Sequence, residues 1–162
     1  MLANPAMLLS NSGMEEAMAG EYERALKNAK RSKRPSRRTY ELLRVVADNG
    51  DPRAIYAIAT WYLHGHEFTG TNFKKAAQML RKAADAGIAE AAYDLAVSCE
   101  KGLGVKKSEK TAFRLYVRAA LLGDAQSHYE VGRMYFWGLG TQRDRKIARD
   151  WFQKAESLGI TG

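Results

Sequence analysis

Apolar residues in the middle of the chain recur at helical spacing, in two runs separated by a short segment. Between Ile88 and Gly123, the recurring positions are Ala92, Leu95, Ala96 and Cys99, and then Ala112, Leu115, Tyr116 and Ala119. Spacings of three and four residues place such positions on one side of an α-helix. The separating segment, GLGVKKSEK, interrupts the pattern, and glycine readily adopts the left-handed geometry that ends helices. No stretch alternates apolar and polar residues as a strand would, so we expect an all-α fold of helix pairs.

The helix pair returns at a fixed interval along the chain. Four glycines lie 37, 36 and 36 residues apart, namely Gly50, Gly87, Gly123 and Gly159. A tyrosine follows each of the first three glycines by six residues, at Tyr56, Tyr93 and Tyr129. Such a period is typical of stacked units, each of which buries its apolar face on its neighbours. We expect a right-handed α/α solenoid with repeats at residues 51–87, 88–123 and 124–159. Solenoids expose long curved surfaces, which suit recognition better than catalysis.

The repeats resemble the Sel1-like repeat family. The resemblance rests on GLGV, MYFWGLG and KIARDWFQKAESLG and covers about residues 51–159. It implies an α/α solenoid related to tetratricopeptide repeats, with adaptor roles between proteins. The first repeat departs from the pattern, because its turn HGHEFTGTN is one residue longer and has Glu67 in place of the second glycine. We expect this turn to differ locally from the other two.

The segment before the repeats has a weaker version of the same pattern. Amphipathic spacing recurs from Met14 to Ala29 and again in TYELLRVVADNG, but KRSKRPS between them lacks the glycine signature. We interpret residues 14–50 as an atypical helix pair, a degenerate or capping repeat, and expect residues 1–13 to be loosely ordered. At the other end, the flank of the last helix would lack a neighbour; a polar surface, self-association and a missing continuation are open alternatives.

Composition sets limits on location. The single cysteine, Cys99, excludes a disulfide within the chain. The N-terminal sequence MLANPAMLLSNSG lacks the basic start of an export signal, and no stretch approaches the ~20 apolar residues that span a membrane. We therefore expect a cytoplasmic protein with no membrane partner.

Positive charge is concentrated in one stretch. The chain carries 26 Lys and Arg against 18 Asp and Glu, a net charge of +8. The basic cluster consists of Lys27, Lys30, Arg31, Lys33, Arg34, Arg37 and Arg38. Such a field favours encounters with an acidic protein surface, which is the partner we expect. Phosphates of a nucleic acid are the alternative ligand, although no aromatic residues interleave with the cluster as stacking platforms.

The candidate catalytic and metal-binding residues do not form recognisable constellations. His64, His66 and Glu67 share one turn, but a metal site needs further ligands, and none clusters with them in the sequence. Cys99 is predicted to lie on a buried helix face, and no nucleophile motif surrounds Ser98. We therefore predict no enzymatic activity, no metal and no cofactor.

The remaining candidates lie on the first helix of each repeat. In the family, first helices line the concave side, and positions not needed for packing are free to contact a partner. The predicted partner-binding residues are Trp61, His64, Asp94, Lys101, Glu130, Arg133 and Trp137. Trp and Arg are enriched among binding anchors, although burial against the next repeat is the alternative role for Trp61 and Trp137. The sequence thus predicts a protein-binding adaptor or regulator, of which an immunity or inhibitor protein would be one form; a nucleic-acid-associated protein is the alternative.

Overall fold

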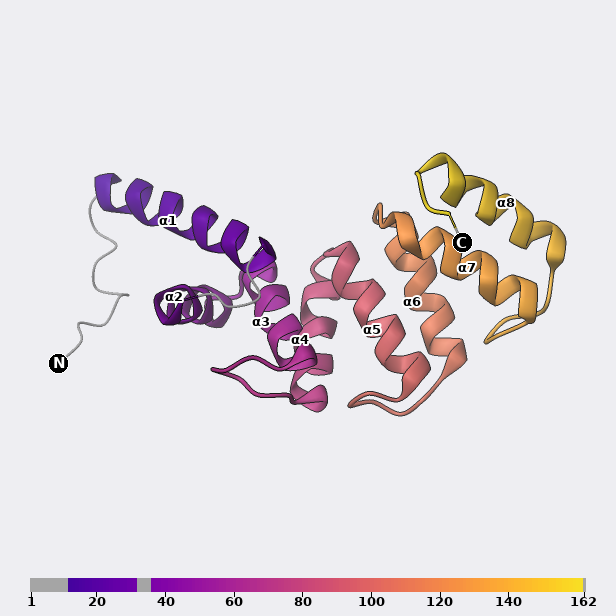
Figure 1. Ribbon diagram of the computed structural model, residues 1–162, viewed down its shortest axis with the longest axis horizontal. Coiled ribbons are helices and arrows are strands. Elements are labelled where there is room, and N and C mark those ends of the chain that lie inside the picture. The colour runs from indigo at the N-terminus through magenta and orange to yellow at the C-terminus, as the bar shows by residue number, and fades with distance from the viewer. Residues whose placement is uncertain (1–11, 32–35, 162) are drawn as a thin grey trace.

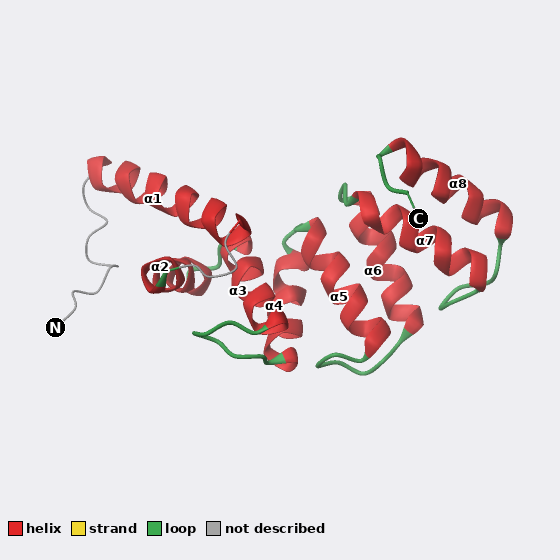
Figure 2. Cartoon of the chain, viewed as in Figure 1, coloured by secondary structure: helices red, strands yellow, loops and turns green. Residues whose placement is uncertain are grey.

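The computed structural model describes residues 12–31 and 36–161, and this part of the chain consists of helices joined by turns (Figure 1, Figure 2). The helices there are α1 (Ser12–Arg31), α2 (Arg37–Asp48), α3 (Pro52–His64), α4 (Phe73–Asp85), α5 (Ala89–Lys101), α6 (Glu109–Leu121), α7 (Ala125–Trp137) and α8 (Arg145–Ser157). No strand occurs in the two described ranges, and the all-α prediction is confirmed. In Figure 1 the helices follow one another along the long axis in a curved row. Its two ends, α1 and α8, both lie higher in the view than α4 and α5 in the middle.

Side-chain caps define where most of these helices begin. The capping residues of α2, α3, α4, α6, α7 and α8 are Ser36, Asp51, Asn72, Ser108, Asp124 and Asp144. Each accepts a hydrogen bond from a main-chain N–H two or three residues later, which satisfies an amide that has no partner within the helix. Gly102 and Gly138 end α5 and α7 in the left-handed conformation, with φ of 76° and 74°. The glycine turns predicted after these two helices are therefore confirmed.

Small residues line the contact between the two helices of each repeat. A Cβ atom on Gly132 of α7 would lie 2.7 Å from the ring of Phe152 on α8, so only glycine lets these helices approach so closely. Ala59 and Ala96, the equivalent residues of α3 and α5, have no exposed surface. Partly buried side chains such as Met79 and Tyr93 each contact two neighbouring core clusters, which makes the core continuous along the row.

The second glycine of a turn fixes how one repeat sits on the previous one. A Cβ atom on Gly104 would collide with the main-chain carbonyl of Phe73, where α4 begins. In the next repeat, a Cβ on Gly140 would collide with the carbonyl of Glu109, where α6 begins. Each of these glycines thus touches the backbone of the preceding repeat's second helix. We call this contact the glycine joint.

The turn of the first repeat is built differently, as expected from its sequence. Gly65 has φ 78° and ψ 127°, outside the left-handed helical region. The rings of His66 and Phe68 instead stack with Trp61 of α3 and Tyr40 of α2, with ring centroids 5.1 to 5.7 Å apart. We call this cluster of four rings the aromatic joint. It attaches the first repeat to the helix pair before it.

The N-terminal segment contains two helices, α1 and α2. Helix α1 is 20 residues long against 13 for each helix from α3 to α8, and begins at Ser12, within the segment expected to be loosely ordered. Residues 1–11, the rest of that segment, lie outside the described residues. Within the described ranges, no helix combines the length and the apolar character that crossing a bilayer requires.

Candidate binding surface on the first helices

Equivalent positions of α3, α5 and α7 form four rows across the repeats, which we call the inner face. Within each helix these positions are separated by four, three and four residues, so they share one side of the helix. The rows are Arg53, Glu90 and Gln126; Ala57, Asp94 and Glu130; Thr60, Val97 and Arg133; and His64, Lys101 and Trp137. No row repeats a residue. The scaffold therefore presents a different chemical surface on each repeat.

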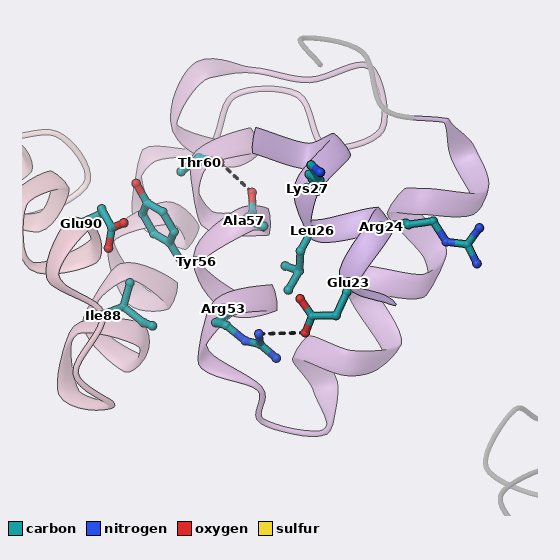
Figure 3. Close-up of a pocket in the computed structure, with 10 residues that line it drawn as sticks. All are labelled: Glu23, Arg24, Leu26, Lys27, Arg53, Tyr56, Ala57, Thr60, Ile88 and Glu90. Atoms are coloured by element: carbon teal, nitrogen blue, oxygen red, sulfur yellow. Dashed lines mark hydrogen bonds and ion pairs between the residues drawn. The ribbon is translucent and has the colours of Figure 1, made fainter. Parts of the chain in front are cut away.

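A groove with a volume of about 880 Å³ lies at the N-terminal end of the inner face, between α1, α3 and the start of α5 (Figure 3). Its apolar lining comes from Leu26 of α1, Ala57 of α3 and Ile88, which precedes α5. Tyr56 and Glu90 contribute to the same wall, and Figure 3 shows these two side chains on the side of the groove opposite α1. The groove is thus an apolar channel edged by charged side chains.

A tyrosine and a carboxylate connect the first two repeats beside this groove. The hydroxyl of Tyr56 donates to the Asp94 carboxylate at 3.1 Å. Burial raises the pKa of Asp94, although the hydrogen bond from Tyr56 acts in the opposite direction. Burial, together with the charges of Asp94, Glu90 and Asp124, also raises the pKa of the Tyr56 hydroxyl. The electrostatic potential around the Tyr56 hydroxyl is therefore negative.

An ion-pair network connects the second and third repeats. The guanidinium of Arg133 donates to both carboxylate oxygens of Glu100, at 2.8 and 3.0 Å, and to Glu130 at 2.8 Å. The hydroxyl of Tyr116 donates to Glu100 at 3.1 Å. Burial alone would lower the pKa of Arg133, but the hydrogen bonds to the two glutamates outweigh it and raise that pKa. Two of the predicted contact residues, Asp94 and Arg133, thus also bond to a neighbouring repeat, while Glu130 pairs with Arg133 within α7.

The other predicted contact residues differ in accessibility. Trp137 is 63% exposed at the end of α7, where its ring meets Phe136 edge to face, and His64 and Lys101 in the same row are exposed. Trp61 is only 7% exposed, because its indole packs between Tyr40 and His66 in the aromatic joint. Trp61 is therefore buried, against α2 and its own turn rather than against the next repeat, and it offers a partner almost no surface.

The basic cluster is only partly described. Lys33 and Arg34 lie outside the described residues, and the side chains of Lys30 and Arg31 are likewise outside the description. Arg37 pairs with Glu41 at 3.0 Å, and Arg38 pairs with Glu21 of α1 at 2.7 Å. Lys27 is exposed and lines the groove. The described part of the cluster therefore extends from the start of α2 to the edge of the groove.

The residues considered for metal binding and catalysis are either packed within the fold or exposed to solvent. His66 is stacked in the aromatic joint, while His64 and Glu67 are exposed. In the part of the chain that the structure describes, no three His, Cys, Asp or Glu residues are grouped as metal ligands. Cys99 is buried, which raises the pKa of its thiol, and the Ser98 hydroxyl donates to the carbonyl of Asp94 at 2.8 Å.

Sequence reasoning did not find the contribution of α1 to the groove. It assigned residues 14–50 to a cap and named no contact residue in the turn before α5, so Glu23, Leu26 and Ile88 were not candidates. The available signal was the length of the helical pattern from Met14 to Ala29, which exceeds that of the repeat helices. A longer helix at the end of a stack can extend beside the first helices that follow it. Its direction, however, depends on tertiary contacts that no local pattern encodes.

Comparison with known proteins places this architecture among known repeats. The Sel1 repeat family model matches residues 52–88, 89–124 and 125–160. DAP3-binding cell death enhancer 1 of Rattus norvegicus is 35% identical over 86 residues, which are 53% of this chain and 16% of that protein. Chitin synthase regulatory factor 2 of Schizosaccharomyces pombe is 31% identical over 90 residues, 56% of this chain and 18% of that protein. The chain thus spans less than a fifth of the length of these relatives.

Two solved structures are similar over most of the chain. A Sel1 repeat protein from Oxalobacter formigenes superimposes with a TM-score of 0.70 and 31% identity, covering 74% of this chain and 90% of that one. The protective antigen c5321 of uropathogenic Escherichia coli gives a TM-score of 0.79 and 27% identity, covering 91% of this chain and 32% of that one. Both similarities support a solenoid of Sel1-like repeats.

Proposed function

The chain belongs to the Sel1 repeat family, and we propose that it binds a partner protein with the inner face of α3, α5 and α7. Sel1 repeat proteins generally act as protein-interaction modules. One relative is named for binding DAP3 and another for regulating chitin synthase. These names describe the relatives alone, but both are consistent with a role that acts through a second protein.

The observation that carries the proposal is the groove on the inner face. Its volume of about 880 Å³ and its apolar lining offer burial to a protruding segment of a partner. Ligand sites in proteins combine such apolar linings with a few placed polar groups, as Tyr56 and Glu90 are here. At the other end of the face, exposed Trp137 is the residue type most enriched among interface anchors. The role is stoichiometric binding rather than catalysis.

Affinity capture with matched variants tests the proposal. The immobilised chain would capture its partner from an extract of the source cells, and Trp137→Ala and Thr60→Arg should each reduce the amount captured. Leu121→Ala is the matched control, because Leu121 is 79% exposed at the end of a second helix, outside the inner face. A partner that is lost with Leu121→Ala and retained by both inner-face variants would refute binding at this face.

A further inference from the structure

The two long sides of the groove carry charges of opposite sign. On the α5 side, Glu90 is exposed and Asp94 lies one helical turn further along the same helix. No described residue forms an ion pair with Glu90. The Asp94 carboxylate does not line the groove itself, but it accepts a hydrogen bond from Tyr56, which does, so its negative charge is held beside the groove wall. This side is anionic.

The α1 side is cationic, and Lys27 is the group that makes it so. Arg53 is compensated, because its guanidinium pairs with Glu23 at 3.0 Å and with Asp51 at 3.4 Å. Arg24 donates to the carbonyl of Gly20 at 3.1 Å, and Figure 3 shows its guanidinium pointing away from the groove. Lys27 forms no ion pair with any described residue, and its ammonium group remains at the edge of the channel (Figure 3).

We propose that the groove binds a peptide segment of a partner protein that is apolar at its centre and oppositely charged on its two sides. The apolar side chain lies over Leu26, Ala57 and Ile88. A Lys or Arg of the segment faces Glu90, with Asp94 nearby, and an Asp or Glu faces Lys27. This inference rests on the proposed function and specifies its ligand. Because charges of opposite sign on the two walls distinguish the two orientations of a bound segment, the groove also selects one direction of binding.

This ligand differs from the uniformly acidic surface that the basic cluster suggests. An acidic segment would meet Lys27 favourably but would place like charges opposite Glu90 and Asp94. Like charges in apposition cost binding free energy, so the α5 wall acts against such a segment. The field around Tyr56, which raises the pKa of its hydroxyl, supports the same conclusion. A wholly basic segment is disfavoured in turn by Lys27.

Selection from a phage-displayed library of short random peptides on the 162-residue chain tests this proposal. Enriched sequences should contain an apolar residue with Lys or Arg on one side and Asp or Glu on the other. Glu90→Lys and Lys27→Glu should each weaken a selected peptide by up to about fivefold, the effect of one partly exposed charge pair. Changing the facing residue of the peptide to the opposite sign should restore binding to the corresponding variant.

Two charge-reversal controls match these variants. Glu109→Lys reverses an exposed carboxylate in the first turn of α6, as Glu90→Lys does in α5. Lys82→Glu reverses an exposed lysine on α4. Both should leave the affinity of the selected peptide unchanged. An equal loss with the controls would show that overall charge, rather than the groove, determines binding, and would overturn the proposal.

The remaining outcomes separate this inference from the proposed function. Peptides that lose affinity with Trp137→Ala but not with Glu90→Lys or Lys27→Glu would leave inner-face binding intact and overturn the groove as its site. Selection of purely acidic peptides would overturn the assignment of the α5 wall. If no peptide is enriched relative to Thr60→Arg, which places a long side chain in the groove, the groove does not bind peptides.

Discussion

Between one repeat and the next, the turn of the later repeat rests on main-chain atoms of the earlier second helix, whereas between α2 and the first repeat four aromatic rings take that place. Gly104 and Gly140 form the first kind of contact, in which even a methyl group would collide with a carbonyl. Tyr40, Trp61, His66 and Phe68 form the second. The glycine joint requires the backbone of the preceding helix to lie at one position. The aromatic joint instead uses side chains, which fill the space between α2 and the first repeat.

The difference explains how an atypical helix pair is attached to regular repeats. A backbone contact is specific but demands that the preceding second helix begin at the expected place, as α4 and α6 do. Helix α2 begins after a segment without the glycine signature, and side chains adapt to such an irregular neighbour more easily than backbone does. In the first repeat the turn residues therefore pack against α2 and α3, whereas in the later repeats they form compact glycine turns.

Removing the indole of Trp61 should have the largest effect on stability. Truncation of a buried tryptophan costs about 3–5 kcal/mol, and here it also removes the ring against which Tyr40 and His66 pack. Because repeats contact only their neighbours, the loss should concentrate at α1 and α2. Hydrogen exchange measured segment by segment on Trp61→Ala should show lost protection there, with α5–α8 retained. Trp137→Ala, at an exposed ring, should change stability by less than about 0.5 kcal/mol.

Uniform loss of protection along the whole chain of Trp61→Ala would contradict a local aromatic joint. It would mean that the helix pair and the three repeats unfold as one cooperative unit. Equal effects of Trp61→Ala and Trp137→Ala would contradict the burial difference between the two rings.

The glycine joint is tested by two glycines with similar backbone angles and different surroundings. Gly104 has φ 68° and faces the backbone of α4, while Gly70 has φ 61° and faces open space. Alanine in the left-handed region costs about 1–2 kcal/mol, which is all that Gly70→Ala should lose. Gly104→Ala should lose a further ~1–3 kcal/mol because the start of α4 must move. Urea unfolding of both variants measures the difference, and equal losses would show that the contact is not tight.

Periodicity predicted the parts of the fold that are local and repeated. The helix pairs, the small residue at Gly132 and the turns at Gly102 and Gly138 follow from spacing and from the conformational freedom of glycine. The burial of Trp61 does not, because it depends on Tyr40 lying opposite and on the irregular turn carrying His66 and Phe68 against the indole. A repeat pattern assigned Trp61 to the free positions of the helix, and only the neighbouring helix pair reverses that assignment.

The inner-face candidates show the same limit. Asp94, Glu130 and Arg133 vary between repeats, which is typical both of contact residues and of side chains that bridge to a neighbouring repeat. The hydrogen bonds of Asp94 to Tyr56 and of Arg133 to Glu100 appear only once the repeats are stacked, and Glu130 pairs with Arg133 within α7. The groove was equally inaccessible to pattern analysis, because one of its walls belongs to α1. Sequence variation thus pointed to the first helices of the repeats but could not separate binding from bridging.

Arg133 provides a third test, of the polar bridge between the second and third repeats. Arg133→Met keeps an apolar stem but leaves Glu100 and Glu130 without their cation, which should cost about 1–2 kcal/mol for a half-buried network. Arg118→Met is the control on the second helices, where an exposed pair with Asp85 is worth less than about 1 kcal/mol. Thermal unfolding compares them. A larger loss from Arg118→Met would mean that the second helices, rather than the inner face, carry the polar coupling between repeats.

Asp94 should give the smallest effect and a distinctive dependence on pH. Its pKa is raised in the folded protein, chiefly by burial, so the folded state binds this proton more tightly than the unfolded state does. The stability that Asp94 contributes is therefore fully present below its ordinary pKa of about 3.9 and is lost as the pH rises through the raised value.

Asp94→Asn stays uncharged and can still accept the hydrogen bond from Tyr56. At neutral pH it should raise the free energy of unfolding by less than about 1 kcal/mol, and with it the melting temperature. This gain should shrink towards acid pH. Asp150→Asn, at an exposed carboxylate of α8, should show no such gain. Melting curves of both variants between neutral and acid pH measure this gain. A gain that grew towards acid pH would mean that the pKa of Asp94 is lowered by folding, not raised.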